Sequence, residues 1–107
     1  MKQVVRDMET RGKEFGQPPN SPKHEAHVIA SVIIDKDTYD EVRDLVPEDF
    51  YIAENRALWT AIQMMDAKGK KFNALSLPYA IKSLELDSEF EGEVDAYITT
   101  LVDENIF

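Results

Sequence analysis

The chain has 107 residues, a net charge of −9 and no cysteine, which allows one domain without disulfides or zinc–thiolate sites. No apolar run approaches the roughly 20 residues that cross a bilayer, and no signal peptide opens the chain, so a cytoplasmic protein without membrane contact is expected. The acidic balance disfavours direct binding to DNA, since that contact depends on Lys and Arg neutralising phosphates.

Residues 1–16 show no sustained helical period and contain Gly12 and Gly16. We expect a mobile N-terminal arm, with at most a short helical turn at residues 4–8. Pro18-Pro19 then forces extended backbone over residues 17–20.

The first strong helix signal is Ser21-Pro22. Serine at the N-cap accepts a hydrogen bond from a free backbone amide, and proline at the first helical position has no amide to leave unpaired. His24 stands where a capping box would need Glu or Gln, and Glu25 adds negative charge to the first turn. Apolar residues at helical spacing predict a mostly buried helix: Ala26, Val28, Ile29, Ala30, Val32, Ile33 and Ile34.

A second helix is expected after Asp35, which can cap it. Tyr39, Val42 and Val46 share one face of this segment, and Pro47 ends it. The connector over residues 48–52 carries Phe50 and Tyr51, whose size favours packing.

Three further helices follow at the same spacing. One covers residues 53–68 and ends before Gly69, one begins with Ser76 as its cap, and the last follows a loop over residues 85–92. Their apolar faces consist of Leu58, Ala61, Ile62 and Met65; Leu77, Ala80, Ile81 and Leu84; and Val94, Tyr97, Ile98 and Leu101.

Five amphipathic segments with short connectors and no convincing period-2 run predict an all-α domain. The core residues expected from these faces are Ile29, Ile33, Val42, Phe50, Leu58, Ile62, Leu77, Ile81, Ile98 and Leu101.

Catalytic and metal-binding patterns are weak. None of the four glycines belongs to a phosphate-binding loop. His24 and His27 lie three residues apart but lack a third ligand, so we expect one exposed and one partly packed histidine and no metal. The serines at positions 21, 31, 76, 83 and 88 are interpreted as caps, packing or loop residues. No catalytic, cofactor-binding or metal residue is assigned, and the partner-binding residues are unknown.

Acidic residues dominate the end of the chain. Between residues 85 and 104 there is no Lys or Arg, and the acidic residues are Glu85, Asp87, Glu89, Glu91, Glu93, Asp95, Asp103 and Glu104. A carboxylate pair for acid–base chemistry could be drawn from them, but solvated faces are the more common explanation. Trp59, Phe50, Tyr51 and Phe72 could form a recognition patch, although core packing is favoured for each of them and for Met64-Met65.

The order of the features is more specific than any single one. The sequence places in order Pro18-Pro19-Asn20-Ser21-Pro22, Glu25 to Asp35, Pro47-Glu48-Asp49-Phe50-Tyr51, Asn55-Arg56, Leu58-Trp59, Ala61-Ile62, Gly69, Leu75-Ser76-Leu77, Gly92, Tyr97-Ile98 and Leu101. Over residues 17–105 this series resembles the N-terminal domain of a DnaB-type replicative DNA helicase.

Several positions depart from the family pattern. Ala30 stands where glycine is usual, Asn73 where an acid is usual, and Glu91-Gly92 where two glycines are usual; His24 and His27 replace more ordinary residues. These departures are typical of a divergent member, such as one carried by a phage or plasmid, and each is compatible with a helix.

The resemblance implies a compact orthogonal bundle of about five to six helices over residues 17–107, which forms the N-terminal collar of a hexameric ring. It implies self-association, primase recruitment in the primosome and contact with a helicase loader. ATP and Mg²⁺ would belong to a RecA-like motor domain, so this chain is expected to be a non-catalytic piece without a cofactor. The resemblance also implies that the helical hairpin which pairs subunits would begin about where this chain ends, so we expect a monomer or weak dimer.

Three rival interpretations remain. The chain could be a stand-alone loader or inhibitor of a helicase, or the helicase-binding domain of a primase. The rival from another class is a small enzyme that uses a carboxylate pair, which a pocket with two buried acids would favour.

Overall fold

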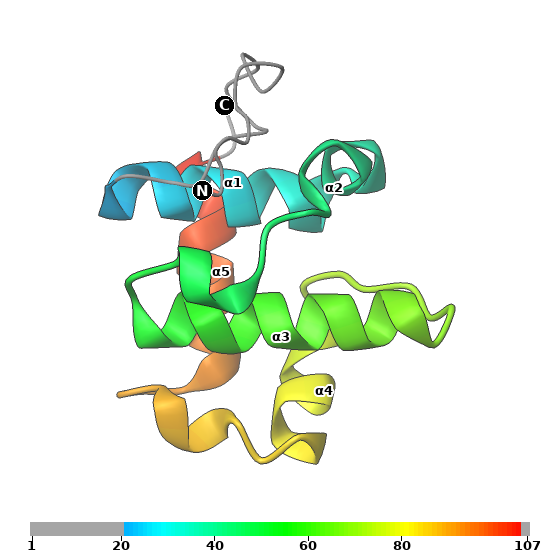
Figure 1. The fold of residues 1–107 in the computed structure, drawn as a ribbon. Coiled ribbons are helices and arrows are strands. Elements are labelled where there is room, and N and C mark those ends of the chain that lie inside the picture. The colour runs from blue at the N-terminus through cyan, green and yellow to red at the C-terminus, as the bar shows by residue number, and fades with distance from the viewer. Residues whose placement is uncertain (1–20, 106–107) are drawn as a thin grey trace.

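The computed structural model describes residues 21–105, and these form five α-helices joined by short connectors and two 3₁₀ turns (Figure 1). No strand occurs within this range, so the predicted all-α class is confirmed. None of the helices in the described range is long and apolar enough to cross a membrane. The expected arm over residues 1–16 and the extended segment 17–20 lie outside the described residues.

Helix α1 (Pro22–Ile34) begins as the sequence predicts. The Ser21 hydroxyl accepts a 3.1 Å hydrogen bond from the backbone amide of His24, and Pro22 occupies the first helical position. Val28, Ile29, Ala30, Val32 and Ile33 are all buried. The prediction was wrong for Ile34, which is exposed because it is the last residue of the helix and the backbone becomes extended at Asp35.

Helix α2 (Lys36–Val42) is capped by Asp35, whose carboxylate accepts a hydrogen bond from the amide of Asp37. The helix ends earlier than expected. Because the chain turns after Val42, Leu45 enters the core in place of Val46, and Val46 is exposed. Pro47 therefore opens the 3₁₀ turn η4 (Pro47–Asp49) rather than ending a helix.

Helix α3 (Ala53–Ala67) crosses the middle of the domain and matches the predicted range to within one residue. Gly69 follows it with φ of +70°, a conformation that glycine adopts without strain. Phe50 and Trp59 are buried in contact with each other, with ring centroids 5.3 Å apart. Tyr51 was expected to pack as well, but its side chain is 77% exposed.

Helix α4 (Leu77–Ser83) packs on α3 through Leu77 and Ile81. Ser76 does not cap it in the predicted way, since its hydroxyl makes no capping bond to the helix. Asn73 organises the turn instead: its side-chain oxygen accepts hydrogen bonds from the amides of Leu75 and Ser76.

Helix α5 (Val94–Asn105) follows the acidic connector, which contains the 3₁₀ turn η5 (Asp87–Glu89). Figure 1 shows α5 running across the direction of α1 and α3, and it packs on both α1 and α4. It thereby closes the bundle. All ten residues predicted for the core are buried.

Candidate functional site

A buried polar network joins three helices. Glu25 of α1 is fully buried and accepts hydrogen bonds from the backbone amides of Tyr51 (2.6 Å) and Ile52 (3.3 Å) and from Nδ2 of Asn55 (2.9 Å). The Tyr97 hydroxyl of α5 donates a 2.7 Å hydrogen bond to Oδ1 of Asn55. The carboxylate lies where the N-terminus of α3 favours negative charge, so it stabilises the entry into that helix.

The phenol of Tyr97 has a raised pKa. Burial of its phenol, followed by the nearby charges of Glu54 and Glu25, raises its pKa to about 12. The phenol therefore stays protonated over the physiological pH range and remains a hydrogen-bond donor to Asn55. This network holds the helices together, and its donors and acceptors are used within the fold.

A second buried carboxylate, which acid–base chemistry would need, does not occur within residues 21–105. Glu25 is the one buried acid there, and three donors already satisfy it. The acids of the connector are exposed, including Glu85, Asp87 and Glu89. The arrangement matches solvated acidic residues more closely than a catalytic pair.

The two histidines lie on the first turns of α1, with His24 partly buried and His27 exposed, as predicted. No cluster of three or more metal-ligating side chains occurs in the part of the chain that the structure describes. Among the serines, Ser21 caps α1, Ser31 is partly buried within it, and Ser83 and Ser88 are exposed.

The four aromatic residues considered as a recognition patch separate into two groups. Trp59, Phe50 and Phe72 are buried, which confirms core packing for them. Tyr51 is exposed, and so is Met64, for which core packing was also favoured.

Within residues 21–105, two of the most exposed large apolar side chains lie around α4. Leu75 is 82% and Tyr79 is 78% exposed, and both line a hollow between α4 and the start of α5. We call this pair the α4 surface. Sequence reasoning did not single it out, although a signal exists: Tyr79 lies on the side of the helix opposite to Leu77 and Ile81, where a polar residue is usual.

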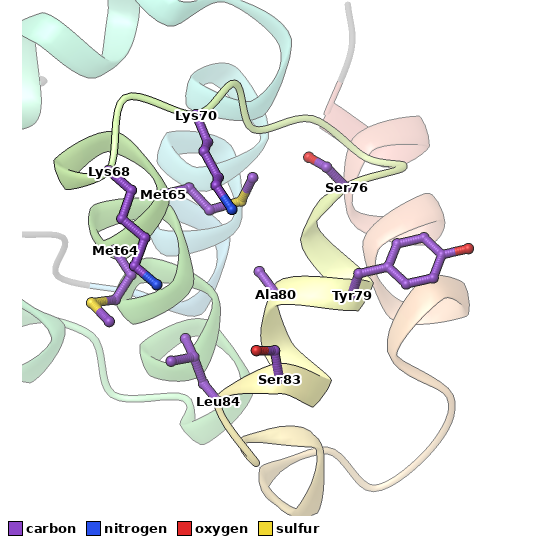
Figure 2. Close-up of a pocket in the computed structure, with 9 residues that line it drawn as sticks. All are labelled: Met64, Met65, Lys68, Lys70, Ser76, Tyr79, Ala80, Ser83 and Leu84. Atoms are coloured by element: carbon purple, nitrogen blue, oxygen red, sulfur yellow. The ribbon is translucent and has the colours of Figure 1, made fainter.

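A groove adjoins the α4 surface on its other side (Figure 2). It lies between the end of α3 and α4 and has a volume of about 320 Å³. Its apolar lining includes Met64, Met65, Ala80 and Leu84, while Lys68 and Lys70 supply positive charge. We call it the lysine groove.

The described elements define a small all-helical domain with a filled core and with exposed apolar side chains that include Leu75, just before α4, and Tyr79 on that helix. Residues 17–106 match the family described as the DnaB-like helicase N terminal domain. The chain belongs to this family, which confirms the resemblance found in the sequence. No curated protein and no solved structure matches the chain.

Proposed function

We propose that this chain is a non-catalytic interaction and oligomerisation domain of a replicative DNA helicase. It would contribute to the N-terminal collar of the hexamer and to the recruitment of primase. The observation that carries the proposal is the combination of family membership with the α4 surface, where Leu75 and Tyr79 are both largely exposed. Large apolar side chains that stay exposed to solvent on a folded domain are typical of protein–protein contact sites.

The interior supports a role without catalysis. The core is filled by aliphatic and aromatic side chains, and the buried network of Glu25, Asn55 and Tyr97 is satisfied internally. ATP and Mg²⁺ would act in a separate RecA-like motor domain, as in the helicases that the chain resembles. This domain would then serve assembly and regulation.

The expected partners are other copies of the helicase subunit, primase and a helicase loader, in the cytoplasm where replication takes place. A net charge of −9 disfavours strong direct binding to DNA. We expect self-association of the isolated chain to be weak.

The test is a calorimetric titration of the chain with the primase from the same source. We expect binding that weakens about tenfold in a Leu75→Ala/Tyr79→Ala variant, since exposed anchors of this kind dominate interface energies. Tyr51→Ala is the matched control, because Tyr51 is 77% exposed but lines neither the hollow beside α4 nor the lysine groove.

One result would contradict the proposal, and another would contradict only the expected weak self-association. Absence of primase binding together with binding to an intact helicase ring would favour the stand-alone loader or the primase domain. A stable hexamer of the isolated chain in sedimentation velocity would contradict the expected weak self-association.

A further inference from the structure

The lysine groove combines an apolar lining with positive charge. Met64 and Met65 line it from α3, and Ala80 and Leu84 from α4. Figure 2 shows the side chains of Lys68 and Lys70 extending from the end of α3 and the following loop toward the space between the two helices. Methionine side chains adapt to irregular partners, so this lining suits an inserted apolar side chain.

The backbone amides of the two lysines bond to carbonyls at the end of α3, but their side-chain charges are not paired within residues 21–105. Lys36 and Arg43 form ion pairs with Asp66, whereas no ion pair involves Lys68 or Lys70 within residues 21–105. No carboxylate lines the groove. The dipole of α3 favours a cation at its C-terminus, which accounts for Lys68. This stabilising effect falls off within the last turn, so it does not account for Lys70, which lies beyond Gly69.

The groove is therefore a basic, partly apolar site on an otherwise acidic chain. We propose that it binds an acidic amphipathic segment of a partner protein. Apolar side chains of the segment enter between α3 and α4, and its carboxylates pair with Lys68 and Lys70. The inference rests on the proposed function only in treating the domain as a protein-interaction module, and it does not require the partner to be primase.

A second copy of this chain fits the groove less well. Its acidic connector offers Asp87, Glu89 and Glu91, but the apolar neighbours Leu86 and Phe90 are packed against its own core. This connector can supply the charges and not the apolar side chains.

Two other occupants are also disfavoured. Residues 1–20 carry the basic residues Lys2, Arg6, Arg11 and Lys13 against Asp7, Glu9 and Glu14, so this segment is not acidic. Nucleic acid would engage the lysines but would leave the methionine lining without an apolar partner.

The experiment uses a fluorescein-labelled peptide about 15 residues long, the length at which an isolated helix becomes marginally stable. It carries leucines at i, i+3, i+4 and i+7 with glutamates beside them, and its binding to the full chain is followed by fluorescence anisotropy. A second peptide replaces the leucines with serines and keeps the charge. We expect the first peptide to bind and the second to bind about tenfold more weakly.

Lys70→Glu and Lys71→Glu form the matched pair of variants. Both lysines are exposed and adjacent in one loop, and the net-charge change is equal, but Lys71 lines a different hollow, beside Phe72. We expect Lys70→Glu to weaken peptide binding about tenfold and Lys71→Glu to weaken it less than about threefold, since exposed charge pairs act locally. Circular dichroism checks that both variants stay folded.

The inference is overturned if neither peptide binds, if both peptides bind equally, or if the two lysine variants lose affinity equally. It is also overturned if a DNA duplex displaces the peptide from the groove in an NMR titration, or if concentration alone shifts the groove and connector signals as self-association would. The chain could also bind primase through Leu75 and Tyr79 and fail to bind the peptide. That outcome would contradict this inference but not the proposed function.

Discussion

Glu25 in the first turn of α1 accepts a 2.9 Å hydrogen bond from Nδ2 of Asn55 in α3, thirty residues further along the chain. Both residues are fully buried. The amides of Tyr51 and Ile52 donate to the same carboxylate, so one acidic side chain fixes the connector that leads into α3. The opening of α1 and the opening of α3 are thereby held against each other.

Replacing Glu25 with glutamine should destabilise the domain by about 2–4 kcal/mol. The new amide group keeps the shape of the side chain but turns one acceptor into a donor that faces other donors. The measurement is urea unfolding, with an unchanged m-value showing that stability alone has changed. Glu48→Gln is the control: Glu48 is exposed, and its replacement should cost within about 0.5 kcal/mol. Equal midpoints for the two variants would show that the network contributes little.

Stability should fall as the pH rises from about 10 to about 12. Burial raises the pKa of Tyr97 to about 12, whereas the unfolded chain loses this proton near 10. Between pH 10 and 12 the unfolded state binds fewer protons than the folded state, so the free energy of unfolding decreases as the pH rises. Below pH 10 the contribution of Tyr97 to stability is fully present. Burial raises the pKa of Tyr39 as well, which adds to the same trend.

Tyr97→Phe isolates the contribution of the one phenol. The variant should lose about 1–2 kcal/mol at neutral pH, because Oδ1 of buried Asn55 loses its donor. Its decline between pH 10 and 12 should be shallower than that of the original chain in thermal unfolding followed by circular dichroism. An identical slope in both proteins would contradict the assignment to Tyr97.

Trp59→Phe should cost about 1–3 kcal/mol, mainly through lost packing in the core. The indole donates a 2.9 Å hydrogen bond to the carbonyl of Leu45, but Gln63 donates to the same oxygen, so that carbonyl keeps a partner. In the double variant Trp59→Phe/Gln63→Ala the carbonyl loses both donors. We expect the double variant to lose more stability than the sum of the single ones in urea unfolding, and strict additivity would contradict the shared-acceptor explanation.

Local signals in the sequence predicted the helices well where the physics is local. Ser21 and Asp35 cap their helices because each side chain reaches an amide only two or three residues away. The 3.6-residue period identified all ten predicted core residues, since a helix face that carries only apolar side chains has to be covered.

The errors occurred where neighbours in space, not in sequence, determine the outcome. Leu45 replaces Val46 in the core because α2 ends at Val42, and the carbonyl of Leu45 is held there by Trp59 and Gln63 of α3. Glu25 carries the charge expected of a first turn, yet its partners lie in the connector before α3 and in α3 itself, which the sequence gives no reason to place beside it. Ser76 is a residue type that often caps helices, but here the side chain of Asn73 accepts the hydrogen bonds that organise the turn before α4.

Periodicity and contacts between residues close along the chain were enough to predict the all-α class, the order of the helices, most of the core and the resemblance to the family. Which large apolar side chains stay exposed to water depends instead on how the helices pack against one another. Leu75, Tyr79 and Tyr51 are large residues of the kind that fill cores, yet the packing of the helices leaves all three exposed. The lysine groove likewise exists only because α4 packs beside the end of α3, which brings Met64 and Lys70 close to Leu84.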